Sequence, residues 1–567
     1  MFSPRPRRLI FLRAAWVLIV LWGEIGVFFY STADCRWPTP DTARPGANLT
    51  SFTEDRSSIG RKAPTRLLLV SDPQILNEDS YPGRNVLLMA LSLFKVDYNM
   101  RKSWRVAKTL KPDVVIFLGD MMDNGRAVSS PKAYHTYLER FWSIFAAPPS
   151  LPTYYIPGNH DVGIGDAPEG TRLARLRYVT SFGPLNQHVT LANHSLMLID
   201  APKLVEQEKE RATTGVSYAQ QLPKEIVEAK FVASITSGGN NPRTPSILFS
   251  HIPLWRPDNS FCGPLSERGT ILSGRGYEYQ NMLSQATSAM LLENFRPSLI
   301  FSGDDHDYCD YTHSLPYDDD QPMSPTDVRE ISVKSFSMAM GVRRPGFHLL
   351  TLFNPDASTA NPIEKATFAD AACLLPDQIR IYLGFYLPLL AISVLIVLHY
   401  SATSGPGSSS SGANKGRGGM PKRERPAAIV IEEGNGNGNG NGYIPMGVRN
   451  DSDLDLALNT AEGGTADDVE LVIPDGLPAP VISPRDWRLP KLSPPPTGVG
   501  VAYAHAPRRR ASIGCVPRFR WWQWRRWGWG RRRDRDAGLL RRFTGDLWAV
   551  AWPAVMICVF LTVVMFW

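Results

Sequence analysis

Five short polar turns constrain the fold of this chain more than any other feature of its sequence. In order along the chain they are Ser71-Asp72-Pro73-Gln74, Gly119 to Arg126, Gly158-Asn159-His160-Asp161, Ser250-His251 and Gly303 to Asp307. All but the third follow a short, continuous run of aliphatic or aromatic residues, as is typical of buried strands, and the third follows a weaker run. We therefore expect strands to deliver these polar side chains to one edge of a sheet.

Helical and extended patterns alternate between the turns. Apolar residues recur at helical spacing over residues 85–110 and 131–145, between the strands that end at the first three turns. This alternation predicts an α/β fold whose site residues lie on the loops after its strands. A hairpin pattern at 188–200 indicates a second sheet. The charged, Gly-rich loop 255–275 is either a binding loop or disordered.

Three apolar runs, at residues 14–30, 381–400 and 547–567, are long enough to cross a bilayer. The first follows several arginines, so an uncleaved anchor competes with a cleaved signal peptide. We favour the anchor, because Glu24 and the bulky aromatic residues near it leave no small-residue cleavage site. For the second and third runs the alternative is a buried core helix.

Basic residues beside the apolar runs favour one orientation in the membrane. Arginines precede the first and third runs, and lysines and arginines follow the second. Such residues concentrate on the cytosolic side, so we expect the N-terminus and residues 401–545 in the cytosol and about 32–378 across the membrane. The glycosylation sequons at Asn48 and Asn193 fall in that lumenal segment, whereas the sequon at Asn450 falls on the cytosolic side.

The six cysteines form no CxxC pattern, which argues against a zinc ribbon or a thioredoxin-like motif. Four of them fall in the segment assigned to the lumen and could pair in three ways: Cys35, Cys262, Cys309 and Cys373. We favour a disulfide between Cys262 and Cys309, because both lie beside the polar turns.

The C-terminal part of the chain has two distinct compositions. Residues 401–506 are of low complexity and cannot bury a core, so we expect a disordered cytosolic linker. Residues 507–535 mix arginine with tryptophan and carry much of the net charge of +7. This segment is predicted to lie on an anionic leaflet, with RNA binding or an unstructured insertion as alternatives. Because the excess charge is local, no nucleic-acid partner is expected for the protein as a whole.

The polar residues of the turns are the types that a two-metal site needs. A carboxylate can bridge two ions while Asn, His and further Asp side chains complete the coordination of each. Such a pair lowers the pKa of bound water and clamps a phosphoryl group, so hydrolysis of a phosphate ester is its natural use. Taken singly, each turn is more often a simple turn or a helix cap. Five of them in this order are the specific signal.

These motifs resemble those of the calcineurin-like metallophosphoesterase superfamily, which run DxH, GDxxDxG, GNH[DE], H and GHxH. The resemblance spans roughly residues 65–355 and implies a four-layer α/β/β/α sandwich. Several stretches are similar to the membrane-bound branch that removes ethanolamine phosphate from mannose of GPI anchors: Asp72-Pro73-Gln74, Gly303 to Cys309, Lys334 to Gly341, and Cys35-Arg36-Trp37-Pro38 after the first apolar run.

The resemblance also implies which residues hold the two divalent ions. Asp120 would bridge them, and the further ligands would be Asp72 and His306 for the first ion and Asn159 and His251 for the second. Two positions depart from the family's pattern. Asp304 replaces a histidine but can still coordinate, and it makes the site richer in oxygen, which favours Mn²⁺ over Zn²⁺ or Fe. Gln74 replaces another histidine and would bind either through its amide oxygen or only through water.

Four more residues receive roles from the same resemblance. His160, oriented by Asp161, would be the catalytic residue that stabilises a phosphoryl oxygen or protonates the leaving group. Asp123 would support the ligands through hydrogen bonds, and Arg126 would contact phosphate.

As a whole, the resemblance implies a metal-dependent phosphodiesterase of the ER membrane, with the Golgi as the alternative compartment. Its partner would be the GPI glycan or a lipid-linked precursor, with a metal-activated hydroxide attacking phosphorus. The alternatives are the same chemistry on a nucleotide or phospholipid diester, and a non-catalytic membrane scaffold with a degenerate metal site.

We expect a cytosolic N-terminus (1–13), an anchor (14–30), a stalk (31–63), a lumenal metallophosphoesterase domain (64–356), a membrane helix (381–400), the linker (401–506), a basic Trp-rich segment (507–545) and a last membrane helix (547–567).

Overall fold

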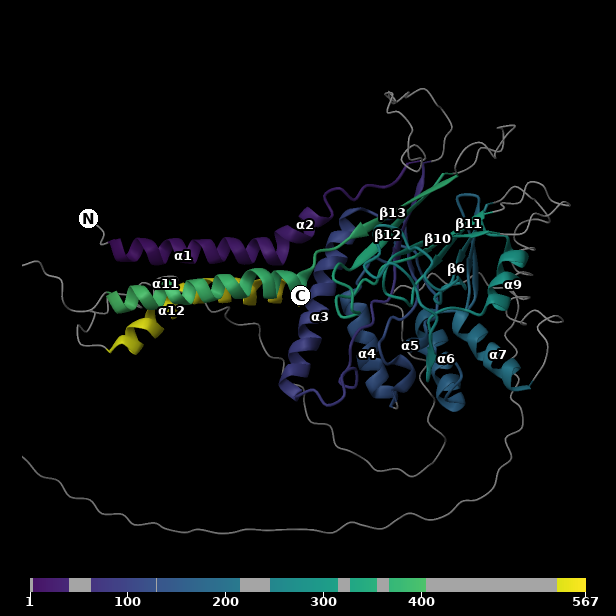
Figure 1. The fold of residues 1–567 in the computed structure, drawn as a ribbon, viewed down its shortest axis with the longest axis horizontal. Coiled ribbons are helices and arrows are strands. Elements are labelled where there is room, and N and C mark those ends of the chain that lie inside the picture. Colours follow the sequence, from purple (N-terminus) through teal and green to yellow (C-terminus); the bar gives the residue numbers. More distant parts are fainter. Residues whose placement is uncertain are drawn as a thin grey trace, which may run out of the picture. The chain divides into compact units, whose positions relative to one another are not determined.

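The computed structural model describes residues 4–39, 63–128, 130–214, 245–314, 327–353, 367–403 and 538–566. Within these residues two β-sheets form the body of the protein (Figure 1). The first sheet has the strand order β13-β12-β1-β2-β3. Its strands are β1 (Thr65–Val70), β2 (Val114–Phe117), β3 (Thr153–Tyr155), β12 (Gly346–Leu352) and β13 (Phe368–Leu374). β1, β2 and β3 run parallel, whereas β12 is antiparallel to both of its neighbours.

The second sheet has the strand order β10-β11-β9-β6-β5-β4. Its strands are β4 (Gln187–Leu191), β5 (His194–Leu198), β6 (Ser246–Phe249), β9 (Leu299–Ser302), β10 (Cys309–Ser314) and β11 (Asp327–Ser332). β4 and β5 form the predicted hairpin, so the prediction of a second sheet is confirmed. A separate two-stranded hairpin consists of β7 (Arg275–Gly276) and β8 (Tyr279–Gln280).

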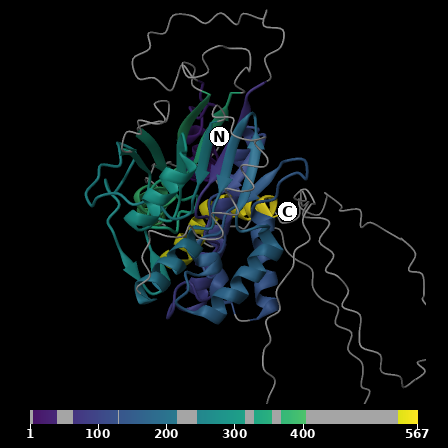
Figure 2. The same ribbon diagram turned by 90° about the vertical axis from the view of Figure 1, so that its right-hand side faces the viewer.

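Helices pack against the outer face of each sheet. α3 (Val86–Thr109), α4 (Pro131–Ile144) and α6 (Pro168–Phe182) share a core with the first sheet. α7 (Ala201–Thr214) and α9 (Gln285–Phe295) share one with the second, and a third cluster of buried residues lies between the sheets. The predicted four-layer α/β/β/α arrangement is thereby confirmed, and Figure 2 shows the same layers after a quarter turn.

The apolar run of β1 is continuous because both faces of the first sheet are covered. Leu67 and Leu69 belong to the core between the sheets, whereas Leu68 and Val70 belong to the core under the helices. Successive side chains of a strand point to opposite faces, so a strand buried on both sides needs apolar residues at every position. The same reasoning explains the runs of β2, β6 and β9.

The first sheet extends beyond residue 356, where we expected the domain to end. β13 pairs with β12, and a disulfide between Cys35 and Cys373 ties it to the segment after the first apolar helix. The sequence of β13 is rich in alanine and carries Asp370, whose carboxylate contacts His348 at 2.9 Å. Alanine and aspartate are depleted in strands, so the residues of this segment do not predict a strand. The segment is a strand because it pairs with β12.

The remaining elements are short or belong to the apolar helices. η3 (Gly125–Ala127) and α5 (Asn159–Val162) lie in the second and third polar turns. The first apolar helix comprises α1 (Pro4–Leu21), the π-helical η1 (Trp22–Gly26) and α2 (Val27–Ser31). The second comprises α10 (Gln378–Arg380), η4 (Ile381–Tyr386) and α11 (Leu387–Thr403), and the third is α12 (Leu539–Phe566).

Three helices are long and apolar enough to span a membrane, over Leu9–Ser31, Gln378–Thr403 and Leu539–Met565. They lie beside one another (Figure 1) and are mostly exposed, which contradicts the alternative of buried core helices. Two residues of α3, Lys102 and Arg105, contact one residue of each helix: Glu24, Gln378 and Val564. The first and third helices therefore end beside the domain, and the second begins there. The predicted membrane topology requires this arrangement, because it places these three helix ends on the same side of the membrane as the domain.

Several predictions fall outside the described residues. These are the sequons at Asn48 and Asn450, most of the stalk 31–63, nearly all of the linker 401–506 and the basic segment 507–535. Asn193 is described and is exposed at the turn between β4 and β5. The loop 255–275 is also described, and a disulfide between Cys262 and Cys309 holds it to the start of β10, which confirms the predicted pairing.

Candidate metal centre

The polar turns meet where parallel strands of both sheets end. Asp72, Asp120 and Asn159 follow β1, β2 and β3 of the first sheet, and His251 and Asp304 follow β6 and β9 of the second. The carboxyl ends of parallel strands lie at one edge of a sheet, where ligands bind in open α/β folds. The expected convergence occurs, but two facing sheets contribute to it instead of one.

The backbone at these turns is strained. Five non-glycine residues have φ in the left-handed region: Asp72 at 46°, Gln74 at 35°, Asp120 at 54°, Asp304 at 64° and His306 at 68°. Such a conformation costs about 1–3 kcal/mol per residue, and residues of this kind cluster at functional sites. Packing is equally tight, since a Cβ atom on Gly158 would lie 2.1 Å from a carboxylate oxygen of Asp120.

Two groups of side chains are arranged so that each could hold a metal ion. Asp72, Asp120 and His306 form the first group, and Asp120, His251 and Asp304 form the second. In each group one ligand atom per residue lies within 4.8 Å of the others. Asp120 belongs to both groups, which is the position that a bridging carboxylate needs.

Hydrogen bonds on the outer side of the centre fix the orientation of two of its side chains, those of His251 and Asn159. His251 Nδ1 donates to the carbonyl oxygen of Leu118 at 2.7 Å, which leaves Nε2 facing Asp120 at 3.4 Å. The amide nitrogen of Asn159 donates to the carbonyl oxygen of Glu278 at 3.1 Å, and its oxygen lies 3.3 Å from His251 Nε2. Such partners set the tautomer and rotamer of a metal ligand. Leu118 and Glu278 carry no sequence signal, because both act here through backbone oxygens.

Burial and charge in the cluster fit divalent cations. Asp304 Oδ2 is buried and has no hydrogen-bond partner among the described residues. Burial raises the pKa of Asp72 to about 8, outweighing the attraction of His251, which lowers it. Carboxylates buried together stay ionised at neutral pH only beside a cation. A donor set of carboxylates, an amide oxygen and imidazoles suits two divalent ions.

Gln74 lies inside the first group. Its amide nitrogen is 2.7 Å from a carboxylate oxygen of Asp120 and 3.0 Å from Nε2 of His306. A half-turn of the amide exchanges its nitrogen and oxygen and would present a neutral oxygen at the same place. The side chain is therefore within reach of the first ion, at the position where the family's pattern has a histidine.

His160 lies at the rim of the centre and contacts Asp123, not Asp161 as we expected. Its Nδ1 atom is 2.5 Å from the backbone oxygen of Asp123 and 3.8 Å from a carboxylate oxygen of that residue. The Asp161 carboxylate instead accepts hydrogen bonds from backbone amides of the second and third turns, those of Met121, Met122 and Gly158. Asp161 is the third residue of α5, so its side chain folds back onto the start of that helix. It therefore holds the turns together.

Two arginines approach the centre. Arg126 donates from Nη1 to the backbone oxygen of Asn159 at 3.0 Å, and its Nε lies 3.8 Å from a carboxylate oxygen of Glu278, so part of its guanidinium supports the third turn. Arg268, which we did not single out from the sequence, donates to the backbone oxygen of Asp305 at 3.0 Å and has a nearly half-exposed side chain. Its only sequence signal is its place in the charged loop 255–275.

Fold and site together define a phosphoric ester hydrolase with ligands for two divalent ions. A family model described as Calcineurin-like phosphoesterase matches residues 65–308. Cell division control protein 1 of Saccharomyces cerevisiae is 31% identical over 379 residues, which cover 65% of this chain and 70% of that protein. The chain belongs to the calcineurin-like phosphoesterase family.

Two further comparisons involve more distant proteins. Metallophosphoesterase 1 of Gallus gallus is 24% identical over 401 residues, which cover 68% of this chain and 89% of that protein. A solved dimetal phosphatase from Danio rerio covers 55% of this chain and 100% of its own, at 11% identity and a TM-score of 0.31.

Proposed function

We propose that this enzyme removes ethanolamine phosphate from a mannose of the GPI glycan. The observation that carries the proposal is the place of Lys334 to Gly341, one of the stretches similar to the GPI-directed branch. Ser335 Oγ donates to the backbone oxygen of Asp72 at 2.8 Å, and its amide donates to the backbone oxygen of His306 at 2.9 Å. The stretch that carries the narrower resemblance thus braces two of the ligand turns.

The ligand set supports a proposal on metal identity. In the proposed site Asp120 would bridge the ions, Asp72 and His306 would hold the first, and Asn159 and His251 the second, as expected from the sequence. Gln74, which contacts His306, is proposed as a ligand of the first ion, and Asp304, grouped with His251, as a ligand of the second. Oxygen donors outnumber imidazoles, and such a set favours Mn²⁺ over Zn²⁺ or Fe. When bound, two such ions activate a water molecule and offset the negative charge of the phosphoryl group.

His160 is proposed as the proton donor to the leaving group. Asp123 engages its Nδ1 atom, so Nε2 is the nitrogen left to exchange a proton with substrate, and 28% of the side chain is exposed. The phosphorus–oxygen bond to mannose breaks as the oxygen of water forms a new bond to phosphorus. His160 gives the mannose oxygen its proton, a proton released from the attacking water restores His160, and ethanolamine phosphate is released. Arg268 is proposed to contact a non-bridging phosphate oxygen.

The lumen of the ER is the proposed compartment. Two disulfides, Cys35–Cys373 and Cys262–Cys309, are typical of proteins that mature in an oxidising environment. Asn193 is exposed at a turn, where a sequon is accessible for glycosylation. The apolar helices would keep the domain at the membrane in which a lipid-linked GPI substrate resides.

Metal dependence tests the chemistry. Full-length protein purified in detergent and stripped with a chelator should hydrolyse bis-p-nitrophenyl phosphate only after a divalent ion is added back, most rapidly with Mn²⁺. Asp120→Ala should abolish this activity, whereas Asp327→Ala, at an exposed position on β11, should not. Absence of activity with every metal would favour the non-catalytic scaffold.

Mass spectrometry of GPI glycans tests the substrate. Cells that lack the protein should carry additional ethanolamine phosphate on a GPI mannose, and wild-type protein but not Asp120→Ala should reverse the change. Unchanged glycans in these cells, with hydrolysis of the chromogenic diester intact, would point to a nucleotide or phospholipid diester instead.

A further inference from the structure

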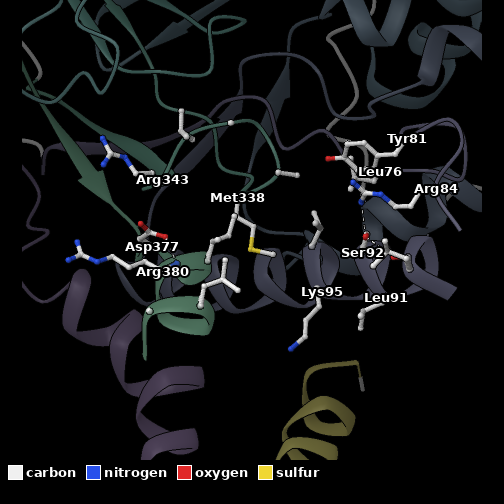
Figure 3. A pocket seen from close by; sticks show the side chains of 18 residues that line it. Leu76, Tyr81, Arg84, Leu91, Ser92, Lys95, Met338, Arg343, Asp377 and Arg380 are labelled. Carbon is white, nitrogen blue, oxygen red and sulfur yellow. Dashed lines mark hydrogen bonds between the residues drawn. The ribbon is translucent and has the colours of Figure 1, made fainter. Parts of the chain in front are cut away.

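A pocket of about 760 Å³ lies between the catalytic domain and the second membrane-spanning helix (Figure 3). One wall is the first half of α3, including Leu88 and Leu91. The second wall is the loop from Met338 to Arg343, and the third is the start of the second apolar helix, from Asp377 to Gly384. The pocket is of the size that holds a small molecule or part of a lipid.

The walls of this pocket present apolar side chains that the described part of the chain leaves uncovered. Leu88 and Leu91 of α3 are each 53% exposed. Leu383 on the opposite wall is 62% exposed. A contiguous apolar surface of this kind marks a site for a partner or a membrane.

The third wall of the pocket belongs to a helix that could span a membrane. Ile379 and Leu383 belong to the helix Gln378–Thr403, one of the three that could span a membrane. The pocket therefore lies where this helix leaves the domain, and Lys95 Nζ of α3 is 4.7 Å from the ring of Tyr382. A bilayer crossed by this helix would begin beside this wall, because Ile379 and Leu383 lie at the start of the apolar helix.

Basic side chains surround the apolar floor. Arg84, Lys95, Arg343 and Arg380 line the pocket together with the carboxylate of Asp377, and Arg343 Nε also lies 3.4 Å from a carboxylate oxygen of Glu267. In Figure 3, Arg343 and Arg380 lie at one end and Arg84 at the other, with Met338 between them. Arg84 is held in place, because it stacks 3.9 Å from the ring centre of Tyr81 and donates to Ser92 Oγ at 2.8 Å.

We propose that this pocket binds an anionic glycerophospholipid of the membrane, with an acyl chain against α3 and the second span and the anionic headgroup at the end of the pocket that carries Arg84. A zwitterionic headgroup carries its own cation beside the phosphate, so the basic side chains attract it less than a headgroup with a net negative charge. A soluble anion would gain nothing from the apolar walls. The site is distinct from the metal centre and stands whichever diester that centre hydrolyses.

The pocket also adjoins the loop that braces the metal centre. Met338 and Ala339 line the pocket, and Ser335, a few residues earlier in the same loop, donates to the backbone of Asp72. A lipid bound here would therefore contact the loop whose Ser335 holds the turn of Asp72.

Photolabelling in nanodiscs tests the proposal on the full-length protein. The probes are diazirine-bearing phosphatidylinositol and diazirine-bearing phosphatidylcholine, each as a minor component of phosphatidylcholine discs, with labelled peptides mapped by mass spectrometry. We expect the phosphatidylinositol probe to label peptides that contain Leu88, Leu91 or Met338. Arg84→Ala should reduce this labelling by about 5-fold, the effect of one basic residue near an anionic headgroup.

Two pairs of variants separate lipid binding from general damage. Leu91→Glu should abolish labelling, whereas Leu173→Glu, on α6 and 46% exposed, should not. Lys132→Ala, at an exposed position at the start of α4, is the matched control for Arg84→Ala. All four variants should hydrolyse the soluble chromogenic diester at the wild-type rate, which shows that the domain is folded.

Several outcomes would overturn the proposal. Equal labelling by the two probes would remove the anionic preference, and labelling spread evenly along the three membrane helices would remove the site. Unchanged labelling in both Leu91→Glu and Arg84→Ala would do the same. Recovery of a cross-linked protein segment at the pocket in place of lipid would assign the surface to a protein partner instead.

Discussion

The ammonium group of Lys102 lies 2.8 Å from the carboxylate of Glu24, and this contact joins α3 of the catalytic domain to the first membrane-spanning helix. Both side chains are almost fully buried. Gln378 of the second span donates to the backbone oxygen of Gly23 at 3.3 Å, so both spans meet the domain at one polar cluster. Glu24, a charge in an otherwise apolar helix, thus has a structural partner in Lys102.

Removal of one member of this pair should destabilise the protein strongly. Lys102→Met leaves the Glu24 carboxylate buried without a cation, which costs about 3–5 kcal/mol in comparable sites. Thermal unfolding of the full-length protein in detergent would measure the loss. The double variant Glu24→Gln with Lys102→Met should recover most of the stability, and an equally unstable double variant would contradict the pairing.

His160→Gln should lower kcat by about 10²- to 10⁴-fold, the usual contribution of a positioned proton donor. The backbone amide of His160 donates to Asp120, and the substitution leaves it in place, so both metal ions should remain bound. Metal content by mass spectrometry is therefore the control. A variant that loses a metal ion together with activity would make His160 a ligand instead of a proton donor.

Gln74→Ala should weaken the binding of the first metal ion more than that of the second. Gln74 contacts His306, which belongs to the first group alone, and Asp120, which belongs to both groups. Loss of such a contact typically weakens metal affinity by about 10- to 100-fold. Titration of the chelator-treated protein with Mn²⁺ would show two separated binding steps. Two unchanged steps would exclude Gln74 from the site.

Acid should destabilise the second sheet through Glu330. Burial acts to raise the pKa of this carboxyl, but Arg256 at 2.9 Å and His313 at 2.6 Å lower it to about 2 from an ordinary value of 4.5. The stabilisation is present above pH 4.5 and is lost as the pH falls toward 2, with a total of about 3 kcal/mol.

The variant Glu330→Gln tests that assignment. Its stability at pH 7 should be lower than that of the wild type, because Arg256 loses its buried partner. Between pH 4.5 and 2 its melting temperature should fall less steeply than that of the wild type. Parallel curves for the two proteins over this range would show that another carboxyl is responsible.

Loss of the Cys262–Cys309 disulfide should destabilise the loop that carries Arg268. The bond closes a loop with a sequence separation of 47, for which the chain-entropy estimate is about 4 kcal/mol. The double variant Cys262→Ser with Cys309→Ser should melt at a lower temperature and show a raised KM for the chromogenic diester. Added reductant should lower the melting temperature of the wild type by more than that of this variant, which retains only Cys35–Cys373, and an equal response would contradict the assignment.

Much of the metal centre could be predicted, because its ligands follow strands whose patterns are local. Asp72, Asp120 and His251 come directly after apolar runs that only buried strands explain, so their convergence could be anticipated. The role of Asp161 could not be predicted. It is adjacent to His160 in sequence, yet one helical turn directs the two side chains to different partners.

The sequence by itself determined the α/β class, the order of the polar turns that carry the candidate ligands, and the three apolar helices. These depend on residue type and on periodicity within a few positions. Only the tertiary structure decided that two sheets share the site, that Ser335 braces Asp72 and that Lys102 meets Glu24. Those pairs are 263 and 78 positions apart. No pattern within one segment records which distant segment will pack against it, so such contacts, and the pocket beside α3, emerge only when the chain is folded.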